Sequence, residues 1–147
     1  MITTYKREGQ HVVGSPLERG QMPPPDTLWI DLLNPEDNER IFISTSLGID
    51  LPNVLEMQEI EASSRLYTES TATYMTLDVL VGFETEEPML DAVLITLTPG
   101  CLVTVRYCEP RAFSIFTTRI RNQPELFATA EDGLLAILDA ITDRTAD

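Results

Sequence analysis

The sequence LDAVLITLTPGCLVTVRY, residues Leu90 to Tyr107, contains two apolar runs separated by Pro99-Gly100. Adjacent proline and glycine are typical of a tight turn, so these runs predict a β-hairpin over 90–98 and 101–107. Apolar residues fall on both faces of the expected strands, as in the run Val93-Leu94-Ile95. A sheet that is apolar on both faces needs a helical layer on each side.

The rest of the chain supplies further strands and those helices. Alternating or continuous apolar patterns predict strands over 2–6, 10–13, 27–33, 65–67 and 73–81. Helices are expected over 35–47, from residue 51 to about 60, from 110 to about 122, and from 130 onward. The segment 14–25 is rich in proline and glycine and predicts an irregular loop, and 84–88 predicts an acidic connection.

Helix-capping residues mark the ends of these helices. Asn34 is expected to cap the first helix, with Pro35 at the first helical position and Gly48 just beyond its end. Asp50 is the expected cap of the short second helix, and Thr129 that of the last. The last helix has no stop signal before the chain ends, which indicates that the natural helix continues or that cations lie beside its aspartates.

The order of elements predicts one domain over residues 1–147. The expected fold is of the α/β class (α+β mixed): a three-layer αβα sandwich whose mixed parallel and antiparallel sheet is flanked by helices. No internal repeat or linker divides the chain.

The charge of the chain argues against nucleic acid as a partner. Ten Lys and Arg residues against 24 Asp and Glu residues give a formal net charge of −14. Such a charge repels phosphate backbones and anionic lipids and attracts counter-cations, although an acidic surface also serves solubility alone. Cys101 and Cys108 lack zinc-site spacing, so we expect buried, reduced thiols. No leader sequence is recognised, and no stretch approaches the roughly 18 apolar residues that span a bilayer, so the chain is expected to be cytosolic in character.

Catalytic patterns are not found in the sequence. His11 is the only histidine and lies in an expected strand, where a surface role is favoured over that of a catalytic base, so Ser-His-Asp and Cys-His schemes have little support. Nucleotide-binding glycine loops and the zinc-protease motif are also missing, and no organic cofactor is expected. A carboxylate-dependent enzyme stays open as an alternative and would need a deep pocket with at least two perturbed acids.

Two groups of acids are candidates for a divalent cation site. Glu56, Glu59 and Glu61 lie on the solvent side of the short helix, and the last helix carries aspartates at four-residue spacing, Asp139, Asp143 and Asp147. Carboxylate oxygens suit magnesium, which takes only one or two from a protein and keeps most of its waters. A solvated helical face explains the same spacing, so both interpretations remain open.

Five segments in order resemble the amino-terminal cytoplasmic domain of CorA-type divalent cation transporters, a group that includes the zinc transporter ZntB. They are WIDLLNPE (Trp29–Glu36), LGIDLPNVLEMQEIEASSRLY (Leu47–Tyr67), TATYMTLDVL (Thr71–Leu80), LTPGCLVTVRYCEPRAF (Leu97–Phe113) and LLAILDAITDRTAD (Leu134–Asp147). The resemblance covers nearly the whole chain. It implies a homopentameric transporter in the inner membrane, with this domain in a cytoplasmic funnel.

The resemblance also implies an ion and a role. The ion is magnesium, with cobalt or nickel as side substrates, or zinc in the ZntB branch. Cations bound between neighbouring subunits would hold the pore shut, and the matching residues here are Glu56, Glu59, Glu61, Asp139 and Asp143. The family pattern has an adjacent Glu-Asp pair on the short helix, whereas Glu56 is followed here by Met57.

The membrane helices and the Gly-Met-Asn selectivity signature of the family are not in the sequence. We therefore expect a domain truncated within the helix that leads to the stalk, joined to the membrane only through the missing segments. Alone, it is expected to be a monomer or a weak oligomer. The alternative is a free-standing metal-sensing or interaction protein of the same fold.

Overall fold

The computed structural model describes residues 1–61, 65–82, 87 and 89–146. The strands are β1 Ile2–Glu8, β2 His11–Pro16, β3 Trp29–Leu33, β4 Leu66–Glu69, β5 Ala72–Val81, β6 Met89–Thr98 and β7 Cys101–Arg106. The helices are α1 Asp37–Leu47, α2 Val54–Gln58, α3 Arg111–Asn122, the 3-10 helix η2 Pro124–Phe127, and α4 Ala130–Ala146. The expected acidic connection 84–88 falls almost entirely outside the described residues.

The strands form one mixed sheet in the order β2-β1-β3-β7-β6-β5-β4. The predicted hairpin is confirmed, because β6 pairs antiparallel with β7 and Thr98 lies opposite Cys101 across the turn. Gly100 has a φ of 85° there, a left-handed conformation that glycine adopts without steric cost. The neighbouring strand β3 pairs with β7 in parallel, which makes the sheet mixed.

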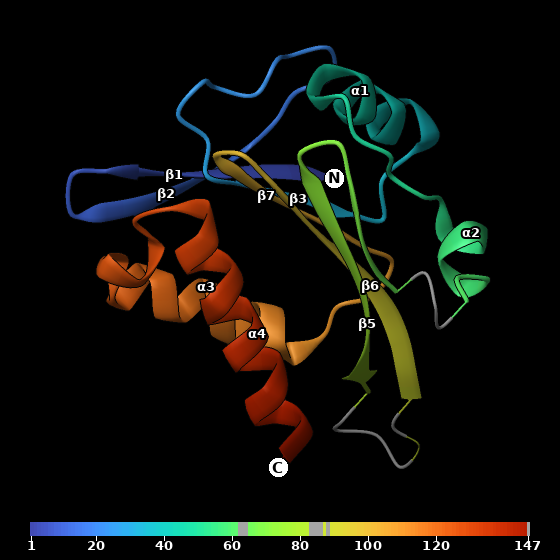
Figure 1. The fold of residues 1–147 in the computed structure, drawn as a ribbon. Coiled ribbons are helices and arrows are strands. Elements are labelled where there is room, and N and C mark those ends of the chain that lie inside the picture. Colours follow the sequence, from blue (N-terminus) through green and yellow to red (C-terminus); the bar gives the residue numbers. More distant parts are fainter. Residues whose placement is uncertain (62–64, 83–86, 88, 147) are drawn as a thin grey trace.

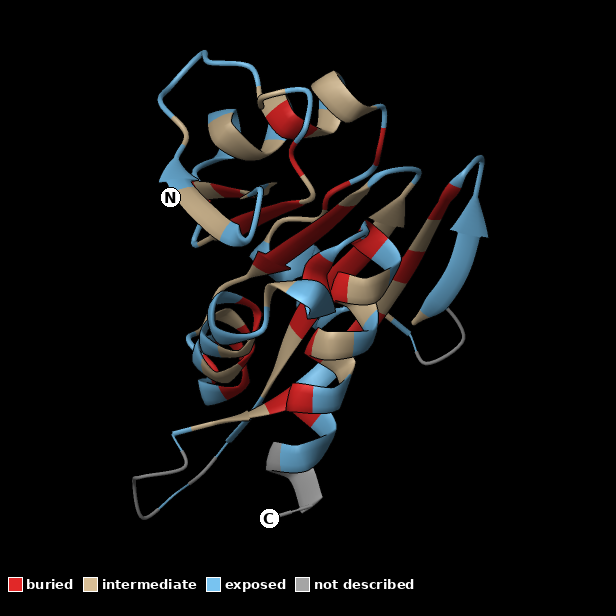
Figure 2. Cartoon of the chain, turned by 90° about the vertical axis from the view of Figure 1, so that its left-hand side faces the viewer, coloured by how far each residue is buried: buried red, intermediate tan, exposed pale blue. Residues whose placement is uncertain are grey.

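Both faces of the sheet are packed, as the apolar runs predict. Val93 and Ile95 join a buried cluster with α3, η2 and α4, while Leu94 between them joins a second cluster with α1 and α2. Figure 1 shows the sheet curled into a half-barrel, with α3 and α4 on one side and α1 and α2 on the other. Figure 2 shows the buried residues concentrated along the central strands and the inner sides of the helices. The mixed α/β class is confirmed, with a curled sheet.

Two predicted helix caps are wrong. The cap of α1 is Glu36, whose N–H donates to Glu39 Oε1 at 3.0 Å. Asn34 instead continues the pairing of β3 with β7, since its N–H donates to the Arg106 carbonyl at 2.9 Å. Its φ is 45°. The cap of α2 is Asn53. Asp50 lies outside that helix, with its N–H donating to the Tyr74 hydroxyl at 3.1 Å.

Of the other local predictions, two helix ends are confirmed, and a strand end and the burial of the cysteines differ. Gly48 closes α1 in a left-handed conformation, and Thr129 Oγ1 accepts the Asp132 N–H at 3.1 Å at the start of α4. The strand β2 continues to Pro16, three residues beyond the prediction, because it stays paired with β1. Cys101 and Cys108 are free thiols, half-buried rather than buried.

Candidate functional site

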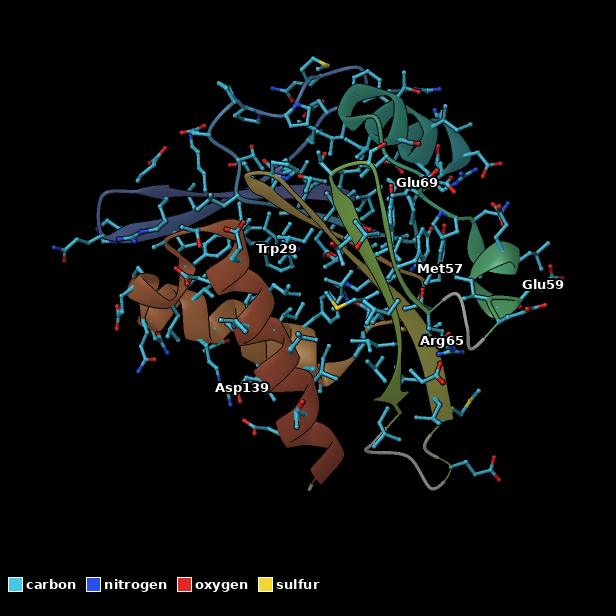
Figure 3. All side chains as sticks on the ribbon, viewed as in Figure 1. Trp29, Met57, Glu59, Arg65, Glu69 and Asp139 are labelled. Atoms are coloured by element: carbon cyan, nitrogen blue, oxygen red, sulfur yellow. The ribbon has the colours of Figure 1, made fainter. Side chains whose placement is uncertain are left out.

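The two groups of acids lie on opposite faces of the sheet. Helix α2 packs through Met57 into the cluster that contains α1, whereas α4 packs through Ile137 into the cluster that contains α3. Figure 3 shows Glu59 and Asp139 on opposite sides of the molecule. A single chain therefore does not bring the predicted ligands together around one ion.

The position of Glu56 is fixed by the start of α2. Its backbone N–H donates to Asn53 Oδ1 at 2.9 Å, and the Asn53 N–H donates back to Glu56 Oε1 at 3.0 Å. This reciprocal pair satisfies two backbone donors that the helix start would otherwise leave free. Met57, which is buried, anchors the short helix to the sheet. Glu56 and Glu59 consequently point to solvent.

The acids of this region border a surface cavity of about 520 Å³ between α2 and the strands β4 to β6. Its charged and aromatic lining consists of Asp50, Glu56, Glu59, Glu61, Tyr67 and Tyr74. The two tyrosine rings stack at a centroid distance of 4.8 Å and form one wall. Burial raises the pKa of Tyr67, and the nearby Asp50 carboxylate raises it further. Four carboxylates around one opening attract cations. We call this group the α2 acidic cavity.

The aspartates of α4 are already paired with an arginine. Arg119 of α3 donates through Nη1 to Asp139 Oδ2 at 3.2 Å and through Nη2 to Asp143 Oδ2 at 2.9 Å. The arginine side chain is 35% exposed, and those of Asp139 and Asp143 are 70% and 52% exposed. One guanidinium thus bridges both carboxylates. Asp147, predicted on the same helical face, lies outside the described residues.

The donor set fits a hard divalent cation only in part. Both groups offer carboxylate oxygens, the ligands that magnesium prefers, and Arg119 shows that Asp139 and Asp143 converge on a single positive charge. Among the described residues, however, no three His, Cys, Asp or Glu side chains are gathered closely enough to hold a metal ion. Each surface could supply one or two ligands to a largely hydrated ion.

Sequence reasoning missed two charged contacts. The first is the contact of Arg119 with Asp139 and Asp143. The sequence shows only that Arg119 lies in the last turn of an amphipathic helix, which does not indicate its partners. The second is the buried pair of Asp31 and Arg106, where Arg106 Nη2 donates to Asp31 Oδ2 at 2.8 Å. A charged residue in each of two apolar strands, WIDLL and CLVTVR, could have suggested this pair.

Comparison of the sequence with known proteins finds magnesium transporters of one family. The family model described as CorA-like Mg²⁺ transporter protein matches residues 25–147. The magnesium transport protein CorA of Escherichia coli K12 is 28% identical over 149 aligned positions that cover 100% of this chain and 46% of that protein. The magnesium transport protein CorA of Pectobacterium atrosepticum is 30% identical over 121 residues, covering 82% of this chain and 38% of that protein. The chain spans about half the length of the curated relatives it matches.

Solved structures share the fold. The CorA magnesium transporter from Methanocaldococcus jannaschii superimposes with a TM-score of 0.71 at 19% identity, covering 99% of this chain and 45% of that one. The ZntB cytoplasmic domain from Vibrio parahaemolyticus gives a TM-score of 0.66 at 12% identity, covering 97% of this chain and 57% of that one. Within the described residues, every helix is too short or too polar to cross a membrane.

Proposed function

Because this chain belongs to the CorA-like Mg²⁺ transporter family, we propose that it is the cytoplasmic metal-sensing domain of a divalent cation transporter. The family consists of transport proteins rather than enzymes. The observation that carries the proposal is the match to residues 25–147, together with an alignment that covers the whole chain but only 46% of the E. coli transporter. The other half of such a protein would hold the membrane part.

In the assembled transporter, we propose that the domain gates ion flux through a homopentamer. The separation of the two acid groups supports this arrangement, because Glu56 and Glu59 lie on one face of the sheet and Asp139 on the other. A cation that uses both groups must therefore lie between two chains. Loss of that cation when cytoplasmic magnesium falls would separate neighbouring domains and open the pore.

Magnesium is the ion that fits best. The two curated relatives named above are magnesium transport proteins, and the candidate ligands, including Glu61 and Asp143, are carboxylates. Zinc favours histidine and cysteine, which neither acid group contains. Cobalt could be a side substrate, and zinc is the ion of the ZntB branch. The binding experiment below distinguishes these ions from magnesium.

The location and extent of the domain follow from the same proposal. We place it on the cytoplasmic side of the inner membrane, with α4 leading towards a stalk and two membrane helices in the full-length protein. The two buried clusters support a three-layer αβα organisation, since each lies between the sheet and one group of helices.

The first test is the gene downstream of the codon for Asp147. The proposal expects more helix followed by two apolar segments of about 20 residues each. A stop codon there would instead favour a free-standing protein of the same fold.

The second test is binding of the ion to the chain itself. Ligands that bind only the folded state raise its stability by mass action, so millimolar magnesium should raise the melting temperature. A rise with micromolar zinc and none with magnesium would assign the chain to zinc. No response to magnesium, cobalt or zinc at protein concentrations at which the chains associate would argue against metal sensing by this chain.

A further inference from the structure

The bridge from Arg119 to Asp139 and Asp143 places a positive charge where a bound cation would lie. Both contacts are made by the Nη atoms of one guanidinium, and the 2.9 Å contact to Asp143 has the length of a charge-assisted hydrogen bond, whereas the 3.2 Å contact to Asp139 is longer and weaker. One guanidinium contacts both carboxylates, so they face the same point between α3 and α4. A guanidinium and a metal ion cannot occupy that point together.

Arg119 is held in place by the fold around it. It lies in the last turn of α3, where its carbonyl accepts the Gln123 N–H at 2.8 Å. Its neighbours Phe116 and Ile120 are fully buried and fix the helix against the core. The arginine therefore reaches the aspartates from a rigid element, with little backbone freedom to move away.

The environment of the bridge is acidic and open to water. A surface cavity beside it is bordered by Arg119, Asp132, Asp139 and Glu125, and Arg119 supplies the positive charge among them. Ion pairs between exposed side chains are weak, because water screens them and ordering the side chains costs entropy. A divalent ion carries twice the charge of a guanidinium, so exchange between the two is feasible.

We propose that Arg119 is an internal counter-ion that competes with the divalent cation for Asp139 and Asp143. The inference rests on the proposed function, since it assumes that these aspartates meet a metal ion. Arg119 then sets the threshold concentration at which the ion binds. Binding of the ion at this point also releases Arg119 and removes the two ion pairs that join the end of α3 to α4.

The test compares Arg119→Gln with a matched variant of the same helix, Arg121→Gln. Both changes remove one positive charge from α3, but Arg121 is exposed, and the arginine that bonds Asp139 and Asp143 is Arg119. Magnesium binding to the full chain is measured by calorimetry, and circular dichroism and thermal melting without metal show that each variant is folded. A third variant, Arg119→Lys, keeps the positive charge but lacks the two Nη atoms that bond the two aspartates.

Freeing the aspartates should tighten magnesium binding by about three- to tenfold in Arg119→Gln, the factor expected when two weak ion pairs no longer have to break. Arg121→Gln should change binding by less than about twofold, because it alters only the screened long-range charge. Arg119→Lys should fall between Arg119→Gln and the wild type. Asp139→Asn combined with Asp143→Asn should abolish the gain of Arg119→Gln.

Several results would overturn the inference. Equal tightening in the two arginine variants would show a general charge effect, and unchanged binding in Arg119→Gln would show that the bridge does not compete. A gain that survives loss of both aspartates would place the ion elsewhere. If the wild type binds magnesium and loses it on changing Glu56 and Glu59 while Arg119→Gln is unchanged, the inference fails and the proposed function stands. If no variant binds magnesium, cobalt or zinc, both fail.

Discussion

Arg106 and Asp31 form a buried ion pair across the parallel strands β7 and β3. Arg106 donates through Nε to Asp31 Oδ1 at 3.2 Å and through Nη2 to Asp31 Oδ2 at 2.8 Å, and the two side chains are 13% and 5% exposed. Asp31 Oδ1 also accepts the Thr104 hydroxyl at 2.7 Å, and the Thr104 hydroxyl oxygen accepts the Trp29 indole N–H at 2.9 Å. This network joins the two strands whose pairing makes the sheet mixed.

Removing one partner of this pair should be costly. Asp31→Ala leaves the Arg106 guanidinium buried without its counter-ion, and breaking a buried pair in this way costs about 3–5 kcal/mol. Urea denaturation should show this loss of unfolding free energy. Asp26→Ala is the control, because Asp26 is exposed and its contact with Lys6 is long, at 3.8 Å. A loss in Asp31→Ala no larger than in the control would contradict the assigned role of the pair.

Gly133 in α4 packs so closely against Phe127 that a larger residue does not fit without a shift. A Cβ atom at this position would lie 2.9 Å from Phe127 Cε1, and the ring is fully buried with its edge against Phe116. Alanine favours a helix over glycine by about 1 kcal/mol, but overpacking a core costs about 1–3 kcal/mol. Gly133→Ala should therefore lower the unfolding free energy by about 1 kcal/mol, as measured by urea denaturation.

A control at an exposed position of α4 separates the two effects. Thr142→Ala adds helix propensity without touching the core and should raise the unfolding free energy by about 0.5 kcal/mol. If Gly133→Ala stabilises the protein as much as Thr142→Ala does, then Phe127 moves freely and the packing argument is wrong.

Local signals in the sequence predict much of this fold because they depend on neighbouring residues. Pro99-Gly100 fixes the hairpin, and Thr129 caps α4 whatever the rest of the chain does. Asn34 has an equally good local signal and fails, because its hydrogen bond to the Arg106 carbonyl of a distant strand accompanies a φ of 45°, outside the extended conformation of an N-cap residue. Capping preferences are worth about 1 kcal/mol, so a long-range hydrogen bond in the sheet can override them.

The candidate site was predictable only in its residue types. Sequence spacing places Asp139 and Asp143 on one helical face, as observed, but it carries no information on which helix packs opposite them. Arg119 is twenty residues from Asp139 in the chain, and only the packing of α3 on α4 brings them together. The same limit applies to Glu59 and Asp139, whose placement on opposite faces follows from the sheet topology.

The half-buried thiol of Cys101 should make stability fall in alkali. Burial raises the pKa of Cys101 from 9.0 to about 12, so the folded state keeps a proton that the unfolded state loses above pH 9. The stabilising contribution is present below the unfolded pKa and is lost as pH rises through the folded one. One such proton gives a slope of at most about 1.4 kcal/mol per pH unit.

Cys101→Ala isolates that contribution from those of the tyrosines with raised pKa values. Urea denaturation from about pH 8 to about pH 10.5 spans the pKa of the unfolded thiol and should show a shallower decline in the variant than in the wild type. The difference in slope is the readout, because a small cavity left by the missing sulfur lowers stability equally at each pH. Parallel declines would mean that the thiol is not desolvated in the folded state.

Neutralising Glu59 should weaken magnesium binding at the α2 acidic cavity without unfolding the domain. Glu59 is exposed, and its backbone, rather than its carboxylate, closes α2 by donating to the Leu55 and Glu56 carbonyls. Glu59→Gln should therefore leave the melting temperature without metal unchanged and reduce its rise with magnesium. Glu56→Gln should reduce that rise too and should change the melting temperature without metal only slightly, because the glutamine amide oxygen can still accept the Asn53 N–H that helps to start the helix. Glu18→Gln is the control for net charge, because Glu18 is exposed and lies in the loop before β3, and it should change neither value.

If Glu18→Gln and Glu59→Gln reduce the magnesium-induced rise equally, the ion responds to overall charge and not to the cavity. If Glu59→Gln leaves the full rise in place, Glu59 is not among the groups that attract the ion.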